Sequence, residues 1–258
     1  MTKLLAISGV TIREALRQKL AVNLLVFALA LVAASFMLST LTFGEQYRVI
    51  VDIGLSAMEV FGTLIAVFLG AGLIARDIER RTLYPIIAKP VSRAEYVLGR
   101  YLGLVATTTL NLLVMAVVFA AVLAYYLKGL AFLRDTPFVA VIASMIVRFA
   151  VVGAIAAFFS CFTTATLSAI FTLSMVVAGL LSSDLVRYWA QQGPLARAVG
   201  KAAFVLVPNL EALNLKEAMV YKDAVPLSFA LTGLGYGVLY AAAVLAFAVA
   251  VFSRRDLR

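Results

Sequence analysis

The sequence predicts an all-α polytopic membrane protein with six transmembrane helices. Two observations carry this prediction: 64% of the 258 residues are hydrophobic, and the mean hydropathy is +1.05. Charged residues make up 14% of the chain, whereas a soluble domain holds about a quarter. A water-soluble fold of this size would have too little polar surface to cover its core, so we expect the lipid bilayer to be the main solvent.

Four apolar stretches are long enough to cross the membrane, since a helix needs about 20 apolar residues to span about 30 Å of hydrocarbon. They are residues 21–40, 53–75, 101–127 and 227–252. A further region, 149–183, holds 35 residues without a charge, and one helix of that length would measure about 50 Å, too long for one crossing. We therefore divide this part of the chain into spans at 137–159 and 163–182, which gives six spans in all.

The distribution of charge predicts the orientation. Six spans leave both termini on one side, which carries 13 Lys and Arg and 5 Asp and Glu, against 8 and 7 on the other side. Because basic residues mark the cytoplasmic side, we expect a multi-pass protein of a bacterial inner membrane with both termini in the cytoplasm. The net charge of +9 then reflects topological anchors and predicts no nucleic-acid partner, because no basic run is interleaved with aromatic residues.

Two segments outside the spans have patterns of their own. Residues 3–19 predict an amphipathic helix, with Arg13 and Arg17 on one face, that lies at the inner membrane interface. The alternative is that these residues extend the first span into the cytoplasm. The outer loop, 183–225, contains an apolar piece at 195–207 that is too short to cross, and the pattern leaves open whether this piece is interfacial or re-entrant.

The residue types present exclude several kinds of chemistry. The chain has one cysteine, Cys161, and no histidine. An intramolecular disulfide is excluded, and neither a metal site nor another cofactor is expected. We expect a protein that is not itself an enzyme. An intramembrane enzyme stays an alternative, although the chain has no clustered Ser/Lys pair or metal ligands. A proton-coupled secondary transporter is another, although no inverted repeat supports it.

The predicted cytoplasmic loop between the second and third spans, 76–100, carries the most specific pattern. Apolar residues recur at helical spacing just after Thr82, at Leu83, Ile86 and Ile87. Pro90 ends this turn, and Ser92 begins a new helix with Glu95 in a capping box. The result is a charged helix–break–helix element joined to two spans, which suits mechanical contact with a soluble partner. The alternative is a solvated hairpin whose arginines only obey the positive-inside rule.

This loop resembles the cytoplasmic coupling-helix loop of ABC-2 type transporter permeases. Pro85 is its one departure from the family's pattern, and the resemblance extends over the chain, including Pro208-Asn209-Leu210 in the outer loop. Among subgroups it is greatest to the six-helix permeases labelled for multicopper-enzyme maturation. The residues that the resemblance implies for ATPase coupling are Arg76, Asp77, Glu79, Arg80, Arg81, Thr82, Leu83, Ile86, Ile87, Pro90 and Arg93.

The resemblance also implies a function and partners. ABC-2 permeases resemble half-transporters, so the chain is expected to couple ATP hydrolysis to substrate export or force transmission, together with two ATPase subunits and a second, identical permease subunit. The chain lacks a phosphate-binding loop, because Gly200-Lys201-Ala202 has neither the required glycine spacing nor the hydroxyl residue after lysine. Membrane lipid surrounds the protein, and a periplasmic accessory protein is a further candidate partner.

Two charges fall inside the predicted spans, and such residues are functional candidates by default. Glu59 and Arg148 lie at comparable depths, because the second and fourth spans run in the same direction. We predict an ion pair that holds these spans together, with contact to an anionic substrate as the alternative. By family analogy the hydroxyl-rich fifth span borders the central path, so Thr166 and Thr172 are conduit candidates. The alternative is that these hydroxyls serve helix packing.

Overall fold

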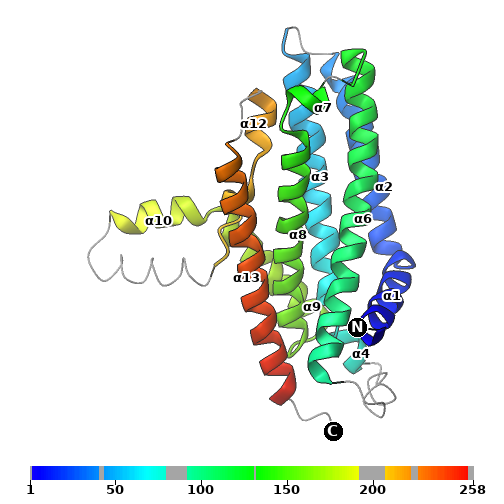
Figure 1. Ribbon diagram of the computed structural model, residues 1–258, viewed down its shortest axis with the longest axis vertical. Helices are drawn as coiled ribbons and strands as arrows, with labels where there is room; N and C mark the ends of the chain where they lie inside the picture. Colours follow the sequence, from blue (N-terminus) through cyan, green and yellow to red (C-terminus); the bar gives the residue numbers. More distant parts are fainter. Residues whose placement is uncertain are drawn as a thin grey trace.

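The computed structural model describes residues 2–40, 44–79, 92–130, 132–191, 207–221 and 226–254, and every regular element in these ranges is helical (Figure 1). The elements are α1 (Thr2–Leu16), α2 (Lys19–Ser39), α3 (Gln46–Ala71), α4 (Ala75–Glu79), α6 (Arg93–Leu127), α7 (Phe132–Asp135), α8 (Phe138–Ser160), α9 (Ala165–Leu180), α10 (Ser182–Ala190), η1 (Glu211–Leu213), α12 (Lys216–Tyr221) and α13 (Leu227–Arg254). The prediction of an all-α polytopic membrane protein is confirmed.

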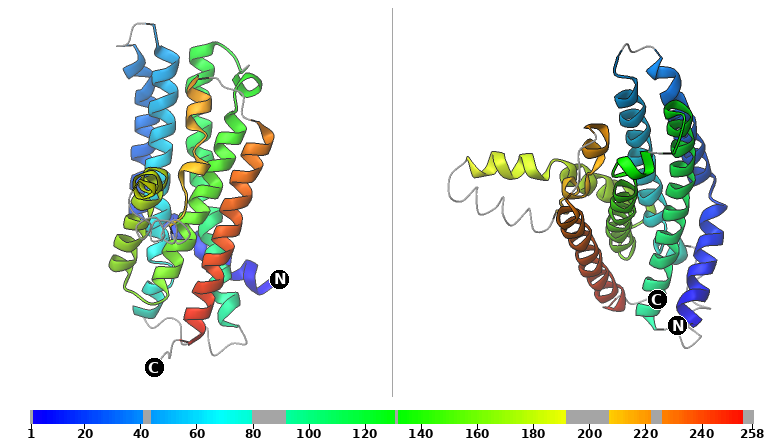
Figure 2. Two further views of the ribbon diagram at one scale, coloured as in Figure 1. Left: turned by 90° about the vertical axis from the view of Figure 1, so that its left-hand side faces the viewer. Right: turned by 45° about the horizontal axis from the view of Figure 1, so that its top comes forward.

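Five helices in the described ranges are long and apolar enough to cross a membrane: α2, α3 with α4, α6, α8 and α13. The helix α9 is apolar but has only 16 residues, which at 1.5 Å per residue reach about 24 Å. It ends because the chain turns at Leu181 and leaves the bundle sideways as α10 (Figure 2). The predicted fifth span at 163–182 therefore corresponds to a helix shorter than the others.

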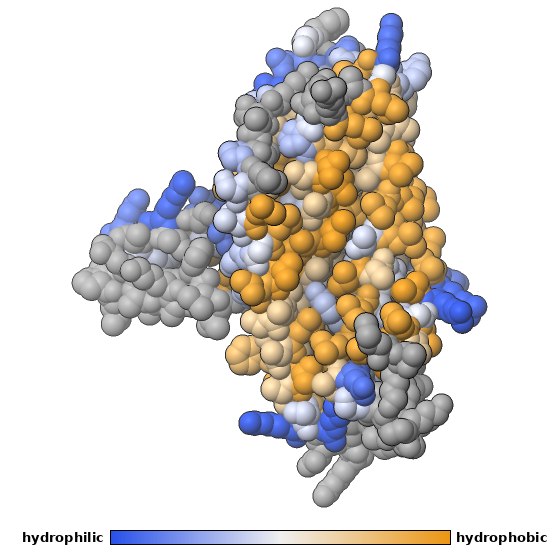
Figure 3. Space-filling model, in the orientation of Figure 1, coloured by the Kyte–Doolittle hydropathy of each residue, from blue (hydrophilic) through white to orange (hydrophobic). Residues whose placement is uncertain are grey.

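The helices α3 and α8 form the centre of the bundle. The most apolar window of the helix containing α3 is 72% buried and that of α8 is 67% buried, against 22% for α2 and α13 and 33% for α6. The outer helices expose many apolar side chains, which give one side of the molecule the hydrophobic surface seen in Figure 3. Both chain ends lie at the same end of the bundle (Figure 1), which we call the terminal end; the opposite end is the far end.

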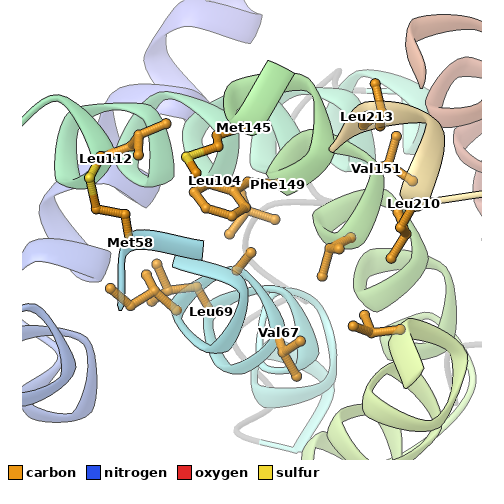
Figure 4. Close-up of a cluster of buried hydrophobic side chains, with 14 of the residues drawn as sticks. Met58, Val67, Leu69, Leu104, Leu112, Met145, Phe149, Val151, Leu210 and Leu213 are labelled. Carbon is orange, nitrogen blue, oxygen red and sulfur yellow. The ribbon is translucent and has the colours of Figure 1, made fainter. Parts of the chain in front are cut away.

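Glycines allow the central helices to approach closely. A Cβ atom on Gly62 of α3 would lie 2.2 Å from the ring of Phe149 on α8, and one on Gly70 would lie 2.6 Å from the Cβ atom of Ala156. Phe149 fills the core together with Met145 and Leu104 (Figure 4). Small residues permit such contacts in membranes, where helices associate by close packing. The helices α3 and α8 therefore fit together as one packed unit.

The amphipathic first helix packs directly on α6. Cβ atoms on Gly99 and Gly103 would lie 2.9 Å from Ile7 and 2.5 Å from Thr11 respectively, so the two α6 glycines, four residues apart, form the seat for α1. Thr11 and Ala15 are buried, whereas Leu16 is 47% exposed. The helix α1 thus turns its polar Thr11 toward the bundle and part of its apolar surface outward.

We predict that Gly103→Ala lowers the free energy of unfolding by about 1–3 kcal/mol, because the added methyl group meets the Cβ atom of Thr11 and the backbone oxygen of Ser8, which cannot move unless α1 shifts. Gly235→Ala on α13 is the matched control, since nothing lies within 4 Å of its Cβ position and alanine favours a helix by about 1 kcal/mol. Thermal unfolding in detergent measures both. Equal effects of the two substitutions would contradict the close packing of α1.

Candidate functional site

The chain bends between α3 and α4, and a side chain of α8 fixes the bend. The hydroxyl oxygen of Ser160 accepts hydrogen bonds from the backbone N–H groups of Ile74 at 2.9 Å and Ala75 at 2.8 Å. Ser160 is fully buried, so these donors, at the start of α4, are satisfied without water. The direction in which α4 enters the following loop is therefore set by the end of α8.

A buried network lies where α4, α6 and α1 meet. Arg100 of α6 donates hydrogen bonds from Nη2 to the carboxylate of Asp77, and from Nη1 to Glu14 Oε2 at 2.7 Å and Thr11 Oγ1 at 3.4 Å. The hydroxyl of Tyr96 also donates to Asp77. We call these five residues the Arg100 network. It joins the helix before residues 80–91, the helix after them and the first helix of the chain.

Burial makes the pairing within this network costly to break. The side chains of Arg100 and Asp77 are each only 9% exposed, whereas that of Glu14 is 41% exposed. Removing one partner of a buried ion pair leaves an uncompensated charge and costs about 3–5 kcal/mol. Removing an exposed partner costs far less, because water replaces the lost contact. The bond between Arg100 and Asp77 is therefore the strong link, and Glu14 adds the connection to α1.

Two further contacts attach the same region to α13 and α9. Arg93, the first residue of α6, donates from Nη1 to the backbone oxygens of Phe252 at 3.2 Å and Ser253 at 2.7 Å, at the end of α13. An arginine is favourable there because helix ends leave carbonyl groups without partners. Glu79, the last residue of α4, accepts a 3.5 Å hydrogen bond from the backbone N–H of Ala165 at the start of α9.

The sequence-predicted coupling residues divide into two groups. Arg76, Asp77, Glu79 and Arg93 are described by the structure and lie at the base of the loop. The remaining seven lie outside the described residues: Arg80, Arg81, Thr82, Leu83, Ile86, Ile87 and Pro90. The predicted capping box is confirmed, because Ser92 Oγ accepts from the N–H of Glu95 while the Glu95 carboxylate accepts from the N–H of Ser92.

Sequence reasoning did not single out Arg100, Tyr96 or Glu14 as site residues. Arg100 stands directly before the apolar run of the third span, at the basic end of the predicted loop. The available signal was spacing, because Arg93, Tyr96 and Arg100 recur at i, i+3 and i+7 and therefore share one face of α6. A polar face on the first two turns of a membrane-length helix indicates partners within the protein.

The structure brings the two intramembrane charges together. Arg148 Nη1 of α8 lies 2.6 Å from Glu59 Oε1 of α3, and the two side chains are 3% and 17% exposed. The Nε–H group of Arg148 has no hydrogen-bond partner within the described part of the chain. The pair lies next to the contact of Gly62 with Phe149, where it adds a polar bond to a junction that is otherwise apolar.

The two conduit candidates on α9 lie in different surroundings. Thr172 is fully buried, and its hydroxyl donates to the backbone oxygen of Ser168 at 2.6 Å. Ser168 is buried as well and donates to the backbone oxygen of Ala156 on α8 at 3.0 Å. Thr166 is exposed. The hydroxyls of Ser168 and Thr172 both bond backbone oxygens, and of the two candidates only Thr166 is exposed.

An all-helical bundle of membrane-length apolar helices, with its charges paired inside, defines a multi-pass membrane protein. A model of the ABC-2 family of transporter proteins matches residues 5–257, so the chain belongs to this family. A comparison with curated proteins finds no match. The chain is thus the membrane permease of an ABC transporter, a transport component associated with an ABC ATPase subunit. The match identifies the family without distinguishing the multicopper-enzyme-maturation subgroup.

We predict that Glu59→Ala and Arg148→Ala each lower the free energy of unfolding by about 3 kcal/mol, because each leaves a buried charge without its partner. The double variant should lose less than the sum of the two single losses. Equilibrium unfolding in mixed micelles measures this cycle. Glu45→Gln is the control, because the pair of Glu45 with Arg48 is exposed on both sides and should contribute less than about 1 kcal/mol. If the loss in the double variant equals the sum of the two single losses, the two side chains are not energetically coupled, which would contradict the predicted pairing.

For the Arg100 network we predict a graded loss of stability. Arg100→Gln should cost about 3 kcal/mol because Asp77 stays buried and charged, and adding Asp77→Asn should recover part of that loss. Glu14→Gln should cost less than about 1 kcal/mol, since Glu14 is partly exposed. The same unfolding measurement applies, with exposed Arg254→Gln at the same end of the molecule as control. Equal losses of unfolding free energy for Arg100→Gln and Arg254→Gln would contradict the greater contribution of the buried ion pair.

Proposed function

We propose that residues 76–100 form the coupling loop through which a separate ATPase subunit drives this permease. The single observation that carries the proposal is the Arg100 network, which ties α4 and the first turns of α6 to α1. A loop that delivers force needs a firm connection to the helices it moves. A solvated hairpin would not need buried ion pairs at its base, and burying them is costly unless they are fully paired.

The contacts around the network support transmission to most of the bundle. Arg93 connects the start of α6 to the end of α13, and Glu79 connects the end of α4 to the start of α9. Ser160 connects the bend before α4 to α8. A displacement of the loop therefore changes bonds on α1, α8, α9 and α13 together. Sub-ångström shifts at such a point are amplified because packed interfaces have discrete arrangements.

The proposed assembly contains two ATPase subunits and a second, identical permease in a bacterial inner membrane, with six crossings and both termini in the cytoplasm. The transporter would export a substrate or transmit force to periplasmic partners. The need for a second subunit is supported by α10, which projects away from the bundle (Figures 1 and 2) with Leu185 42% and Tyr188 62% exposed. Exposed apolar side chains on a projecting helix are favourable sites for a partner surface.

We predict that combining Leu83→Asp with Ile86→Asp weakens binding of the ATPase subunit at least about tenfold, because both apolar residues lie in the proposed contact and a few such residues carry most of the binding energy of an interface. Purification of the permease with its ATPase from membranes measures the ratio of the two subunits and the ATP turnover. Lys128→Gln and Glu211→Gln, both exposed and outside the loop, are the controls.

An unchanged subunit ratio and unchanged ATP turnover in the Leu83 and Ile86 double variant would overturn the proposal. The variant must first show the unfolding temperature of the parent protein, so that loss of the ATPase is not a consequence of unfolding. This requirement is realistic because both positions fall in the predicted cytoplasmic loop, outside the predicted spans.

A further inference from the structure

The helix α1 lies at the level where the apolar runs of its neighbours end. It runs along the terminal end of α6 (Figure 1), seated on Gly99 and Gly103, and the apolar run of α6 begins at Tyr101. On the side of α3, it borders a small cavity together with Gly72 and Leu73, close to the end of the apolar run of that helix. The ends of apolar runs mark the boundary of the hydrocarbon. The helix α1 therefore lies at the depth of the lipid headgroups.

The side of α1 that faces away from the bundle has an apolar strip and a basic strip. Leu5 and Leu16 are 68% and 47% exposed, and they share one face because they lie about three turns apart. Arg13 and Arg17 are exposed about a quarter turn further round the helix. A helix with this arrangement lies in the membrane interface, with its apolar strip against acyl chains and its basic strip against headgroups.

Three arginines on and beside α1 have no partner in the described part of the chain. Within the described residues, the guanidinium groups of Arg13, Arg17 and Arg76 make no ion pair and no hydrogen bond. Arg76 of α4 folds back over the bend that faces α1, since a Cβ atom on Gly72 would lie 2.4 Å from Arg76 Nε. A guanidinium group matches the oxygens of a phosphate with two parallel hydrogen bonds. These arginines are therefore available to phosphate groups outside the protein.

The helix that presents Arg13 and Arg17 outward is bonded inward to the Arg100 network. Glu14, which stands between them in the sequence, accepts a hydrogen bond from Arg100 Nη1 at 2.7 Å. Thr11, one turn earlier, accepts from the same nitrogen at 3.4 Å. Both bonds depend on the position of α1 against α6. A ligand that holds the outward side of α1 in place thus also stabilises the base of residues 76–100.

We propose that the outward side of α1, together with Arg76, binds the headgroups of anionic phospholipids, and that this binding holds the base of residues 76–100. A lipid fits this side better than a soluble anion, because its acyl chains also cover Leu5 and Leu16, which a soluble anion leaves in water. An anionic headgroup fits better than a zwitterionic one, because only a net negative charge compensates arginines without acidic partners. The effect on transport rests on the proposed function above, whereas the lipid site does not.

Titration of the purified permease with lipid tests the site. The unfolding temperature is followed in a non-ionic detergent while short-chain phosphatidylglycerol is added, and the concentration that gives half of the stabilisation is recorded. With Arg13→Gln, Arg17→Gln and Arg76→Gln together we expect this concentration to rise at least about tenfold, because each basic residue near an anionic surface contributes about fivefold. Short-chain phosphatidylcholine, which carries no net charge, should stabilise the parent protein and this variant equally.

A charge-matched variant separates the site from a general effect of net charge. Lys128→Gln, Arg187→Gln and Arg254→Gln together remove three exposed cations outside α1 and α4, and the half-stabilising concentration should stay unchanged. Should the first triple variant not fold, Arg13→Gln with Arg17→Gln should give a smaller rise. Equal rises in the two triple variants would overturn the proposal. Stabilisation by inorganic phosphate equal to that by phosphatidylglycerol would indicate a site for soluble anions and would also overturn it.

Measurement of ATP turnover keeps this proposal distinct from the proposed function. The complex with its ATPase is placed in vesicles of phosphatidylcholine, or of equal parts phosphatidylcholine and phosphatidylglycerol, and the anionic lipid should raise ATP turnover at least about twofold. Glu14→Gln should retain the lipid affinity but weaken this response, because the bond to Arg100 is lost. An affinity that depends on the three arginines, with a turnover that ignores the lipid, would support the lipid site and count against coupling through residues 76–100. An affinity that ignores the three arginines would remove the lipid site.

Discussion

The bond between Arg100 and Asp77 is the constraint on which the terminal end of the molecule depends. Both side chains are almost fully buried, so neither can lose its partner without leaving a charge in a medium that does not solvate it. The two residues stand near the two ends of the proposed coupling loop, residues 76–100. The bond therefore closes the base of that loop and makes α4 and α6 move together. Glu14 extends the same bond to the first helix.

Two kinds of contact divide the molecule into a packed body and an attached part. Within the body, glycines under aromatic rings, such as Gly54 under Phe119 and Gly62 under Phe149, leave no room for sliding. The attached part consists of α9 and residues 207–221, whose contacts with α3 include the ion pair of Lys216 with the partly exposed Asp52. Dense apolar packing resists displacement in steps smaller than a side chain, whereas a hydrated ion pair can open and close. The distribution of contacts thus indicates that rearrangement of the attached part costs less free energy than rearrangement of the packed body.

Hydropathy was sufficient to predict the fold class, and the spacing of Ser92 and Glu95 was sufficient to predict a helix start. The similar predicted depths of Glu59 and Arg148 in the membrane were enough to predict that they pair. Their contact also depends on the rotation of α3 and α8 about their axes, which the packing of Gly62 against Phe149 determines. The early end of α9 could not be predicted, because apolar residues continue through Leu181 and the helix is met by Pro208 from a distant part of the chain. The partners of Arg100 are also remote, so local patterns do not reveal them.

The short α9 has a consequence for the surrounding lipid. A helix of 16 residues reaches about 24 Å, roughly 6 Å less than the hydrocarbon thickness of a typical bilayer. Lipid beside it must compress to match, at a cost of a fraction of a kcal/mol for each ångström of mismatch. That cost grows with the perimeter of the deformed patch. Two copies that placed their α9 helices together would share one patch, so bilayer elasticity would favour their association on this side of the molecule.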